Sequence, residues 1–234
     1  MLRPSRRRLI TGALSATILA TGVRSASAQA ETQQADQLVE KSRLTLESFV
    51  ADSHLEAFRD LLRRCKGLFL APQVLRGAFF IGAAGGSGAF LAHDDKAGRW
   101  AGPAFYTLGE LSFGFQAGGD ASEVAILAMT ERGVTAMLSS SIKLGGDASI
   151  AAGPFGIGAS AATANLSVDM LSFSRTKGLY GGISLQGAAV TVRGALNRAF
   201  YSRDVTPTDI LIRHDVSNPR AAPLIQSVAA AAGR

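Results

Sequence analysis

The sequence predicts an α+β protein: a Gly-rich antiparallel β-sheet or barrel-like core with N-terminal and C-terminal flanking helices. Two changes in composition indicate this arrangement. Residues 29–66 contain no glycine or proline, whereas 22 of the 26 glycines lie between Gly77 and Gly194. Within that interval, short apolar or alternating runs are separated by turn residues, which is typical of antiparallel sheets rather than of βαβ units. Helical patterns return near the C-terminus.

Residues 1–28 are predicted to be a secretion signal of the twin-arginine type. Four arginines without an acid precede an uncharged apolar run from Leu9 to Val23, and Ala26–Ala28 forms an A-x-A cleavage signature. The tract Ser5–Ile10 places paired arginines before apolar residues, as twin-arginine signals do. The run is too short to anchor in a bilayer. A mitochondrial transit peptide is the alternative, but its charge would be spread along its length. We therefore expect export to the periplasm, with peripheral attachment to a membrane as an option.

Removal of this segment changes the charge of the protein. Five of the 24 basic residues and none of the 18 acids lie in residues 1–28, so 24 − 5 leaves 19 basic against 18 acidic residues. The net charge of the remainder is +1 rather than +6. A nucleic-acid partner is not expected, because that interpretation depends on overall basicity.

The segment 29–66 is predicted to be helical. Apolar residues recur at i, i+3, i+4 and i+7 over residues 33–50, which indicates an amphipathic helix that packs on the sheet. Insertion of this helix into a membrane interface is the alternative. Ser53 is expected to cap a second helix over 54–64. Cys65 continues the apolar stripe of that helix, so a buried thiol is favoured over a catalytic nucleophile.

Residues 67–234 are predicted to form a β-rich domain with C-terminal helices, and 29–234 to fold as one unit. A short helix is expected at about 132–140, and two more at 206–213, behind a Thr206 cap, and at 219–231. The many glycines predict bulges, strong curvature or close packing. The predicted strands are Gly77–Ala84, Gly88–His93, Arg99–Leu108, Glu110–Ala117, Ser122–Thr130, Ala148–Ala152, Gly156–Ala164, Met170–Ser174, Gly181–Leu185 and Ala188–Arg193.

Several tracts between about Leu68 and Tyr201 resemble the SYLF family, lipid-binding domains of bacteria and of eukaryotic actin-patch and endosomal proteins. The tracts are 77–82, 86–88, 100–105, 114–118, 153–156, 174–187 and 197–201. The resemblance implies a β-rich core and binding of anionic phospholipid headgroups without catalysis. Its signature residues, expected to be structural, are Gly82, Gly86, Gly88, Trp100, Pro103, Gly118, Gly153, Pro154, Gly178 and Gly182.

Peripheral binding to anionic lipid requires clustered cations, each worth about 1 kcal/mol near the surface. The candidate lipid-binding residues are Arg59, Arg63, Arg64, Lys66, Arg175 and Lys177. The first four form the densest cluster after residue 28, and the last two flank a tract that resembles the family signature. A solvated helix face and a turn lysine are the alternative interpretations.

No catalytic residue, cofactor or metal site is expected. His54, His93 and His214 match no zinc spacing. The G-x-G-x-x-A pattern over 156–161 lacks the strand and helix context of a dinucleotide site. The expected function is therefore phospholipid or membrane-surface binding in the bacterial envelope, and a periplasmic structural or scaffold protein that binds protein partners is the alternative.

Overall fold

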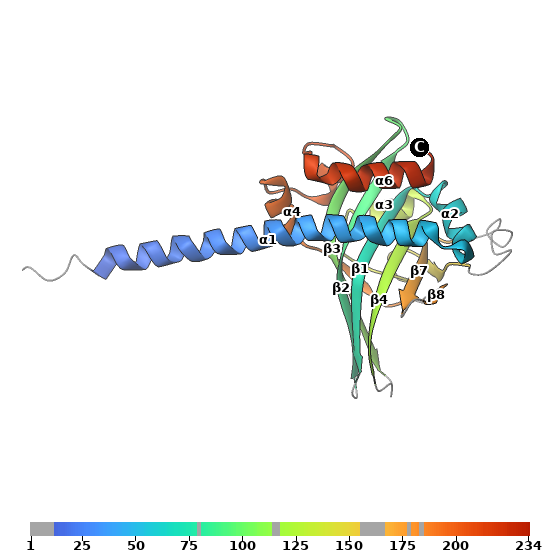
Figure 1. The fold of residues 1–234 in the computed structure, drawn as a ribbon, viewed down its shortest axis with the longest axis horizontal. Helices are drawn as coiled ribbons and strands as arrows, with labels where there is room; N and C mark the ends of the chain where they lie inside the picture. Colours follow the sequence, from blue (N-terminus) through green and yellow to red (C-terminus); the bar gives the residue numbers. More distant parts are fainter. Residues whose placement is uncertain (1–11, 79–80, 114–117, 155–166, 177–178, 183–184) are drawn as a thin grey trace, which may run out of the picture.

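The structure is a computed structural model that describes residues 12–78, 81–113, 118–154, 167–176, 179–182 and 185–234, with side chains outside 12–27, 76–84, 110–120 and 179–182. Helices at both ends of the chain flank one large sheet, so the α+β class is confirmed (Figure 1). The elements are α1 (Gly12–Ala51), η1 (Ser53–Leu55), α2 (Glu56–Leu62), β1 (Gly67–Ala78), β2 (Ile81–Asp94), β3 (Arg99–Phe113), β4 (Gly118–Ala128), α3 (Glu131–Ala136), β5 (Ser141–Lys143), β6 (Ile150–Ala152), β7 (Met170–Thr176), β8 (Leu179–Gly182), β9 (Ala189–Val192), α4 (Gly194–Tyr201), α5 (Pro207–Leu211), η3 (Pro219–Ala221) and α6 (Ala222–Ala232).

The described strands form a single curled sheet. Their order is β5-β9-β3-β2-β1-β4-β7-β6, with β8 beside β7, and every pairing except β6–β7 is antiparallel. The two edge strands β5 and β6 follow one another in the chain, and a bridge between Leu144 and Ala148 lies in the short connection between them. This connection draws the two edges of the sheet together, which gives the predicted barrel-like core.

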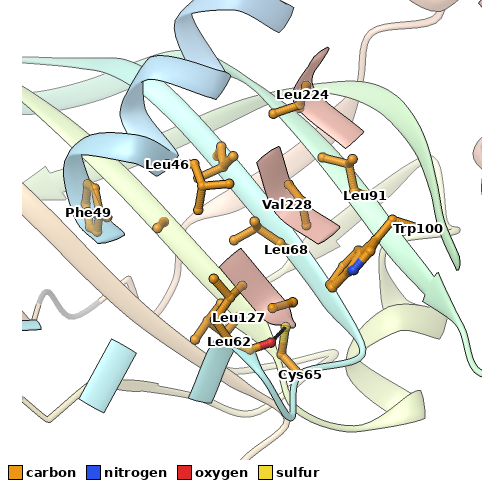
Figure 2. Close-up of a cluster of buried hydrophobic side chains, with 14 of the residues drawn as sticks. Leu46, Phe49, Leu62, Cys65, Leu68, Leu91, Trp100, Leu127, Leu224 and Val228 are labelled. Atoms are coloured by element: carbon orange, nitrogen blue, oxygen red, sulfur yellow. Dashed lines mark hydrogen bonds between the residues drawn. The ribbon is translucent and has the colours of Figure 1, made fainter. Parts of the chain in front are cut away.

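The sheet is buried on both faces. The outer face is covered by α1, α2, α4 and α6, and the inner face is filled by side chains from strands at both edges together with α3 and α5. Figure 2 shows part of the outer core, where Leu46 of α1 and Val228 of α6 meet Leu68 of β1. In β1, Leu68 and Leu70 face outward while Phe69 and Ala71 face inward. Burial on both faces explains the uninterrupted apolar runs of the strands.

The amphipathic pattern over residues 33–50 is confirmed as part of α1. Its sheet-facing side chains are Ala35, Leu38, Val39, Ser42, Leu46 and Phe49. The helix extends further than predicted, because it begins at Gly12 and runs through the proposed cleavage signature. Its first half projects beyond the body (Figure 1). Among the described residues, no helix has both the length and the apolar character needed to cross a bilayer. The division of the chain into a signal, a helical segment and a β-rich domain stays a prediction.

The second helix starts with a different cap from the one predicted. The side chain of Asp52, not Ser53, accepts a hydrogen bond from the His54 backbone N–H at 2.7 Å. The helix is also split into η1 and α2. The Thr206 cap of α5 is confirmed as a capping box with Asp209.

The predicted hairpin around Gly85–Ser87 is wrong, because these residues lie inside β2. Residues Gly67–Ala78 form the central strand β1 instead, which the sequence pattern missed. Pro72 misled the interpretation, since proline is excluded from central strands except at bulges. It occupies such a bulge: the register of β1 shifts by one residue against both β2 and β4 at this point.

The other strand predictions are largely confirmed with shifted ends, as β3, β4, β6, β7, β8 and β9. The predicted strand over 110–117 is wrong as a separate element, because its described part continues β3 to Phe113. The short helix at 132–140 is α3, which starts and ends earlier. Besides β1, two described elements were missed, the short edge strand β5 and the helix α4. The predicted strand over 156–164 lies outside the described residues.

Candidate functional site

Close contacts surround five of the family-signature residues: Gly86, Gly88, Trp100, Pro103 and Gly153. A Cβ atom added to Gly88 would lie 2.3 Å from the Phe69 ring, and one on Gly153 would lie 2.2 Å from the Phe173 ring. Trp100 is buried in the outer core (Figure 2). The carbonyl oxygen of Pro103 accepts a hydrogen bond from the Tyr201 hydroxyl at 2.8 Å, Gly86 adjoins the β1 bulge, and Pro154 is partly buried. Backbone alone places Gly82, Gly118 and Gly182 in β2, β4 and β8, and Gly178 lies outside the described residues.

Some members of the predicted cationic cluster, Arg59, Arg63, Arg64 and Lys66, contact other parts of the protein, and others are exposed to solvent. The Arg59 guanidinium donates to the carbonyl oxygens of Val50, at 3.2 Å, and Asp52, so it binds the C-terminal end of α1. Carbonyl groups at a helix end otherwise lack partners, and a cation is favourable there. Arg59 therefore contributes to the fold, and its charge is directed at the backbone rather than at solvent.

Lys66 is held by two acids. Its ammonium group pairs with Asp95 and lies 3.6 Å from Glu131. The hydrogen bond to Asp95 raises the pKa of Lys66 and, reciprocally, lowers the pKa of Asp95. Arg63 pairs with Asp60 at 2.9 Å but keeps 59% of its side chain exposed. The described acids around the cluster thus neutralise much of its charge.

Arg175 lies far from this cluster. It pairs with Glu123 across β4 and β7, near the C-terminal end of β7. The Lys66 N–H binds the carbonyl of Ala128, which is opposite Met170 at the other end of β7. Five residues of strand, or about 16 Å, separate the two ends. The structure therefore does not bring the two predicted groups of cations together, and Lys177 lies outside the described residues.

A cleft of about 650 Å³ opens between the end of α2 and the start of α3. The exposed residues Arg64 and Arg132 line it, together with Thr130, Ser149 and Asp169. The Arg132 side chain is 68% exposed, and its Nε atom lies 3.6 Å from the Asp169 carboxylate. The two guanidinium groups at one cleft suit oxygen-rich anions.

The Asp169 carboxylate is saturated by donors from the protein. Thr130 Oγ1 donates to it at 2.8 Å, and the hydroxyl and backbone N–H of Ser149 donate at 2.8 and 3.0 Å. Burial alone raises the pKa of this carboxyl, but these hydrogen bonds and the charge of Arg132 outweigh burial and hold the pKa below its usual range. Asp169 therefore stays ionised and holds Thr130 and Ser149 in place at the wall of the cleft.

Sequence patterns identified Arg64 but missed Arg132 and Asp169. These residues come from segments that are distant in the sequence and meet only when the sheet curls. Arg132 was treated as part of a helix, and no local spacing connects it with Arg64 or Asp169. A search for arginines next to predicted helix ends would have included it.

Features of a catalytic or metal centre are not assembled among the described residues. Cys65 is buried, its thiol donates to the Leu62 carbonyl at 3.3 Å, and burial raises the pKa of that thiol to about 12. The described part of the chain holds no group of three His, Cys, Asp or Glu side chains placed to bind a metal. The G-x-G-x-x-A pattern lies outside the described residues.

The described residues thus form a curled sheet with two cores and an arginine-lined cleft. Among known proteins, residues 109–231 match the family Ysc84, described as Las17-binding protein actin regulator. The match covers more than half of the chain, so the chain belongs to the Ysc84 family, also called SYLF.

Similar proteins carry this domain within longer chains. An SH3 domain-containing protein of Schizosaccharomyces pombe is 36% identical over 166 residues, which cover 69% of this chain and 38% of that protein. Protein YSC84 of Saccharomyces cerevisiae is 30% identical over 205 residues, 86% of this chain and 43% of that protein. SH3 domain-containing YSC84-like protein 1 of Bos taurus is 31% identical over 164 residues, 69% and 47% of the two chains. This chain therefore spans less than half the length of these relatives.

Proposed function

We propose that the protein is a peripheral binding module for anionic phospholipid headgroups, and that the cleft between α2 and α3 receives the headgroup. The observation that carries the proposal is the meeting of Arg64 and Arg132 at one cleft of about 650 Å³. A guanidinium group forms paired hydrogen bonds with phosphate oxygens. Thr130 and Ser149 line the same cleft, but their hydroxyl groups donate to Asp169, so the two arginines supply the donors to the headgroup.

The expected affinity is modest. Three cations are counted, Arg63, Arg64 and Arg132, because they are exposed, whereas Arg59 and Lys66 are partly buried. At about 1 kcal/mol each, three cations supply about 3 kcal/mol, on the order of a hundred-fold in partitioning. Binding of this size is reversible, depends on anionic lipid and weakens with salt.

Export through the twin-arginine pathway remains part of the proposal. Removal of residues 1–28 is compatible with the fold, because Ala28, Gln29 and Ala30 are exposed. The Thr32 hydroxyl, four residues beyond the cut, lies 3.0 Å from the Ala28 carbonyl oxygen, which the cut would remove, and 3.4 Å from the Ala199 carbonyl oxygen of the body, which would remain. The lipids available would then be those of the bacterial envelope. Mass spectrometry of the protein from a periplasmic fraction tests this, and a chain that retains its N-terminus in the cytoplasm contradicts it.

Cosedimentation with vesicles tests the lipid proposal. Vesicles that contain phosphatidylglycerol should bind the protein at low salt, and phosphatidylcholine vesicles should not. The double variant Arg64→Glu/Arg132→Glu should lose binding. The matched control is Arg198→Glu/Arg203→Glu, which makes the same charge change at exposed residues near α4. Equal loss in both variants, or no binding of the unaltered protein at low salt, overturns the proposal.

Binding of a protein partner is the second candidate function. It is supported by the family description, which names Las17 binding and actin regulation, and by relatives named for SH3 domains. A scaffold role of this kind is tested by crosslinking in the native envelope and identification of what copurifies. A protein captured without any affinity for vesicles would favour this candidate over lipid binding.

A further inference from the structure

A groove runs beside α1 on the outer face of the sheet. Two adjoining hollows, of about 270 and 590 Å³, share Lys41, Pro72 and Gln73 and so form one continuous depression. It extends along α1 from Gln34 to Thr45, about 16 Å at 1.5 Å per residue. The groove lies away from the arginine-lined cleft. Arg175, at one end of the groove, is near the C-terminal end of β7, whereas the cleft lies at the other end of β7, beside Asp169 and Leu171.

The β1 bulge creates the floor of this groove. Phe69 and Ala71 point inward, and regular alternation would continue with Gln73 and Leu75 inside. The extra residue at the bulge instead keeps Val74 inside and leaves Leu75 on the outer face. Gly86 permits the bulge, because a Cβ atom there would lie 2.1 Å from the Gln73 carbonyl oxygen.

Each of the two hollows of the groove contains one exposed leucine. Large apolar side chains that are exposed in the described part of the chain are Leu44, Leu75 and Ile212, at 50%, 55% and 49%. Two of these three, Leu44 and Leu75, line the groove. Exposed apolar side chains are ordinary when scattered, but two of them along one depression beside a helix mark a surface for binding.

The rim of the groove is cationic. Lys41 stands at the middle, and Arg175 at one end is paired with Glu123. At the other end Arg193 donates to Gln34 at 3.1 Å and to Ser87 at 2.9 Å. Among the described residues, Lys41 lines the groove and Arg193 contacts two of its lining residues, in addition to the Arg175–Glu123 pair, so a complementary occupant carries negative charge.

The shape of the groove favours a helix over an extended strand. Its floor strands β1, β2 and β4 are each paired on both sides, so an incoming strand finds no free ladder edge. In Figure 1, α6 and α1 lie side by side across the strands, and the strands continue beyond α1 on its other side. A third helix fits beside α1 with the spacing of about 8–10 Å that packed helices adopt.

We infer that the groove between α1 and the bulged strand β1 binds an acidic amphipathic helix of a protein partner. Leu44 and Leu75 would contact its apolar stripe, and Lys41 and Arg193 its acidic flanks. A second copy of this chain fits less well, since the projecting part of α1, Gly12–Ala30, contains no acid. The inference rests on the protein-partner candidate and names the surface for it.

Fluorescence anisotropy with a synthetic helix tests this inference. The probe is a labelled peptide of about 14 residues, long enough for the groove, with Leu at i, i+3, i+4 and i+7 and Glu elsewhere. The protein should bind it saturably, and Leu75→Glu and Lys41→Glu should each weaken binding about ten-fold or more. Ile212→Glu, the matched control at the exposed leucine-sized residue outside the groove, should leave binding unchanged. Leu75→Ala should weaken binding without added charge, and circular dichroism confirms that each variant folds.

Several outcomes overturn the inference. One is a scrambled or Lys-substituted peptide that binds as well as the Glu peptide, and another is binding that ignores Leu75→Glu. Self-association that Leu75→Glu abolishes would assign the groove to a second copy, and loss of vesicle binding in that variant would assign it to lipid. A native partner still captured by the Leu75→Glu chain would reject the groove while leaving the protein-binding function intact.

Discussion

Asp169 accepts hydrogen bonds from both the backbone N–H and the hydroxyl of Ser149, at 3.0 and 2.8 Å. Because Ser149 directly precedes β6 and Asp169 directly precedes β7, this pair joins an edge strand to its neighbour. Thr130 binds the same carboxylate from the start of α3. One buried acid thus connects three segments where the curled sheet brings them together.

Asp169→Ala should destabilise the protein by about 3 kcal/mol, because three donors lose their acceptor. Denaturation in urea measures the change in free energy of unfolding. Asp147→Ala is the control: Asp147 is exposed and accepts a hydrogen bond from the Lys143 N–H at 2.7 Å. It should cost less than about 1 kcal/mol. Equal costs for the two variants would contradict the role assigned to Asp169.

The same carboxylate predicts a dependence of stability on pH. The pKa of Asp169 is lower in the folded protein than its ordinary value of 3.8. Its contribution is therefore complete above that value and is lost as the pH falls through the lower, folded pKa. Urea denaturation at a series of pH values should show a smaller acid-induced loss of stability in Asp169→Asn than in the unaltered protein. Parallel pH profiles would refute this prediction.

The close approach of Gly88 to the Phe69 ring predicts that a larger side chain at position 88 destabilises the protein. Gly88→Ala places a methyl group 2.3 Å from the Phe69 ring, and should destabilise the protein by about 1–3 kcal/mol. Combination with Phe69→Leu should restore part of the loss, since the ring is removed. Gly109→Ala is the control, because nothing lies within 4 Å of its added Cβ atom. It should change stability by less than about 1 kcal/mol. Thermal unfolding of the variants measures these differences.

Asn197 predicts a hydrogen-bonding effect. Its buried Oδ1 atom accepts a hydrogen bond from the Phe105 N–H at 2.8 Å. Phe105 lies next to Tyr106, where the pairing of β3 with β9 ends. Asn197→Leu leaves this N–H without an acceptor and should cost about 1–3 kcal/mol. Hydrogen exchange should become faster at the Phe105 amide. Unchanged protection of that amide would show that the side chain does not complete β3.

The burial of Cys65 predicts that its thiol reacts slowly with thiol reagents in the native protein. Burial raises the pKa of its thiol to about 12, so the reactive thiolate is scarce at neutral pH. A thiol-reactive disulfide should label the native protein only as fast as it opens, and should label it at once in denaturant. Rapid labelling of the native state would contradict the burial of Cys65 in the outer core.

The sequence patterns predicted the features that depend on local chemistry. The period of the apolar residues identified the packed part of α1, and Thr206 with Pro207 identified the start of α5. Both depend on residues within one or two turns of each other. The β1 strand was missed because its alternation shifts by one residue at Pro72, and only the neighbouring strands show that the shift is a bulge.

Local patterns likewise indicated only some of the residues of the candidate cleft. Arg63 and Arg64 are exposed as expected from their place near the end of α2. The pairing of Lys66 with Asp95 and the meeting of Arg64 with Arg132 result from tertiary contacts between distant segments. No spacing in the sequence carries that information, so charge clusters alone overestimated the cations that face solvent.

The bulge at Pro72 has a consequence for how β1 tolerates changes in length. Counted along the chain, β1 has one residue more than its two neighbours need at this point. Deletion of Pro72 would leave Phe69, Ala71 and Val74 in one unbroken alternating series, with the same side chains inside. The surplus residue is therefore not needed for pairing. It bends the strand and increases its twist, and so bears on the shape of the sheet rather than on its connectivity.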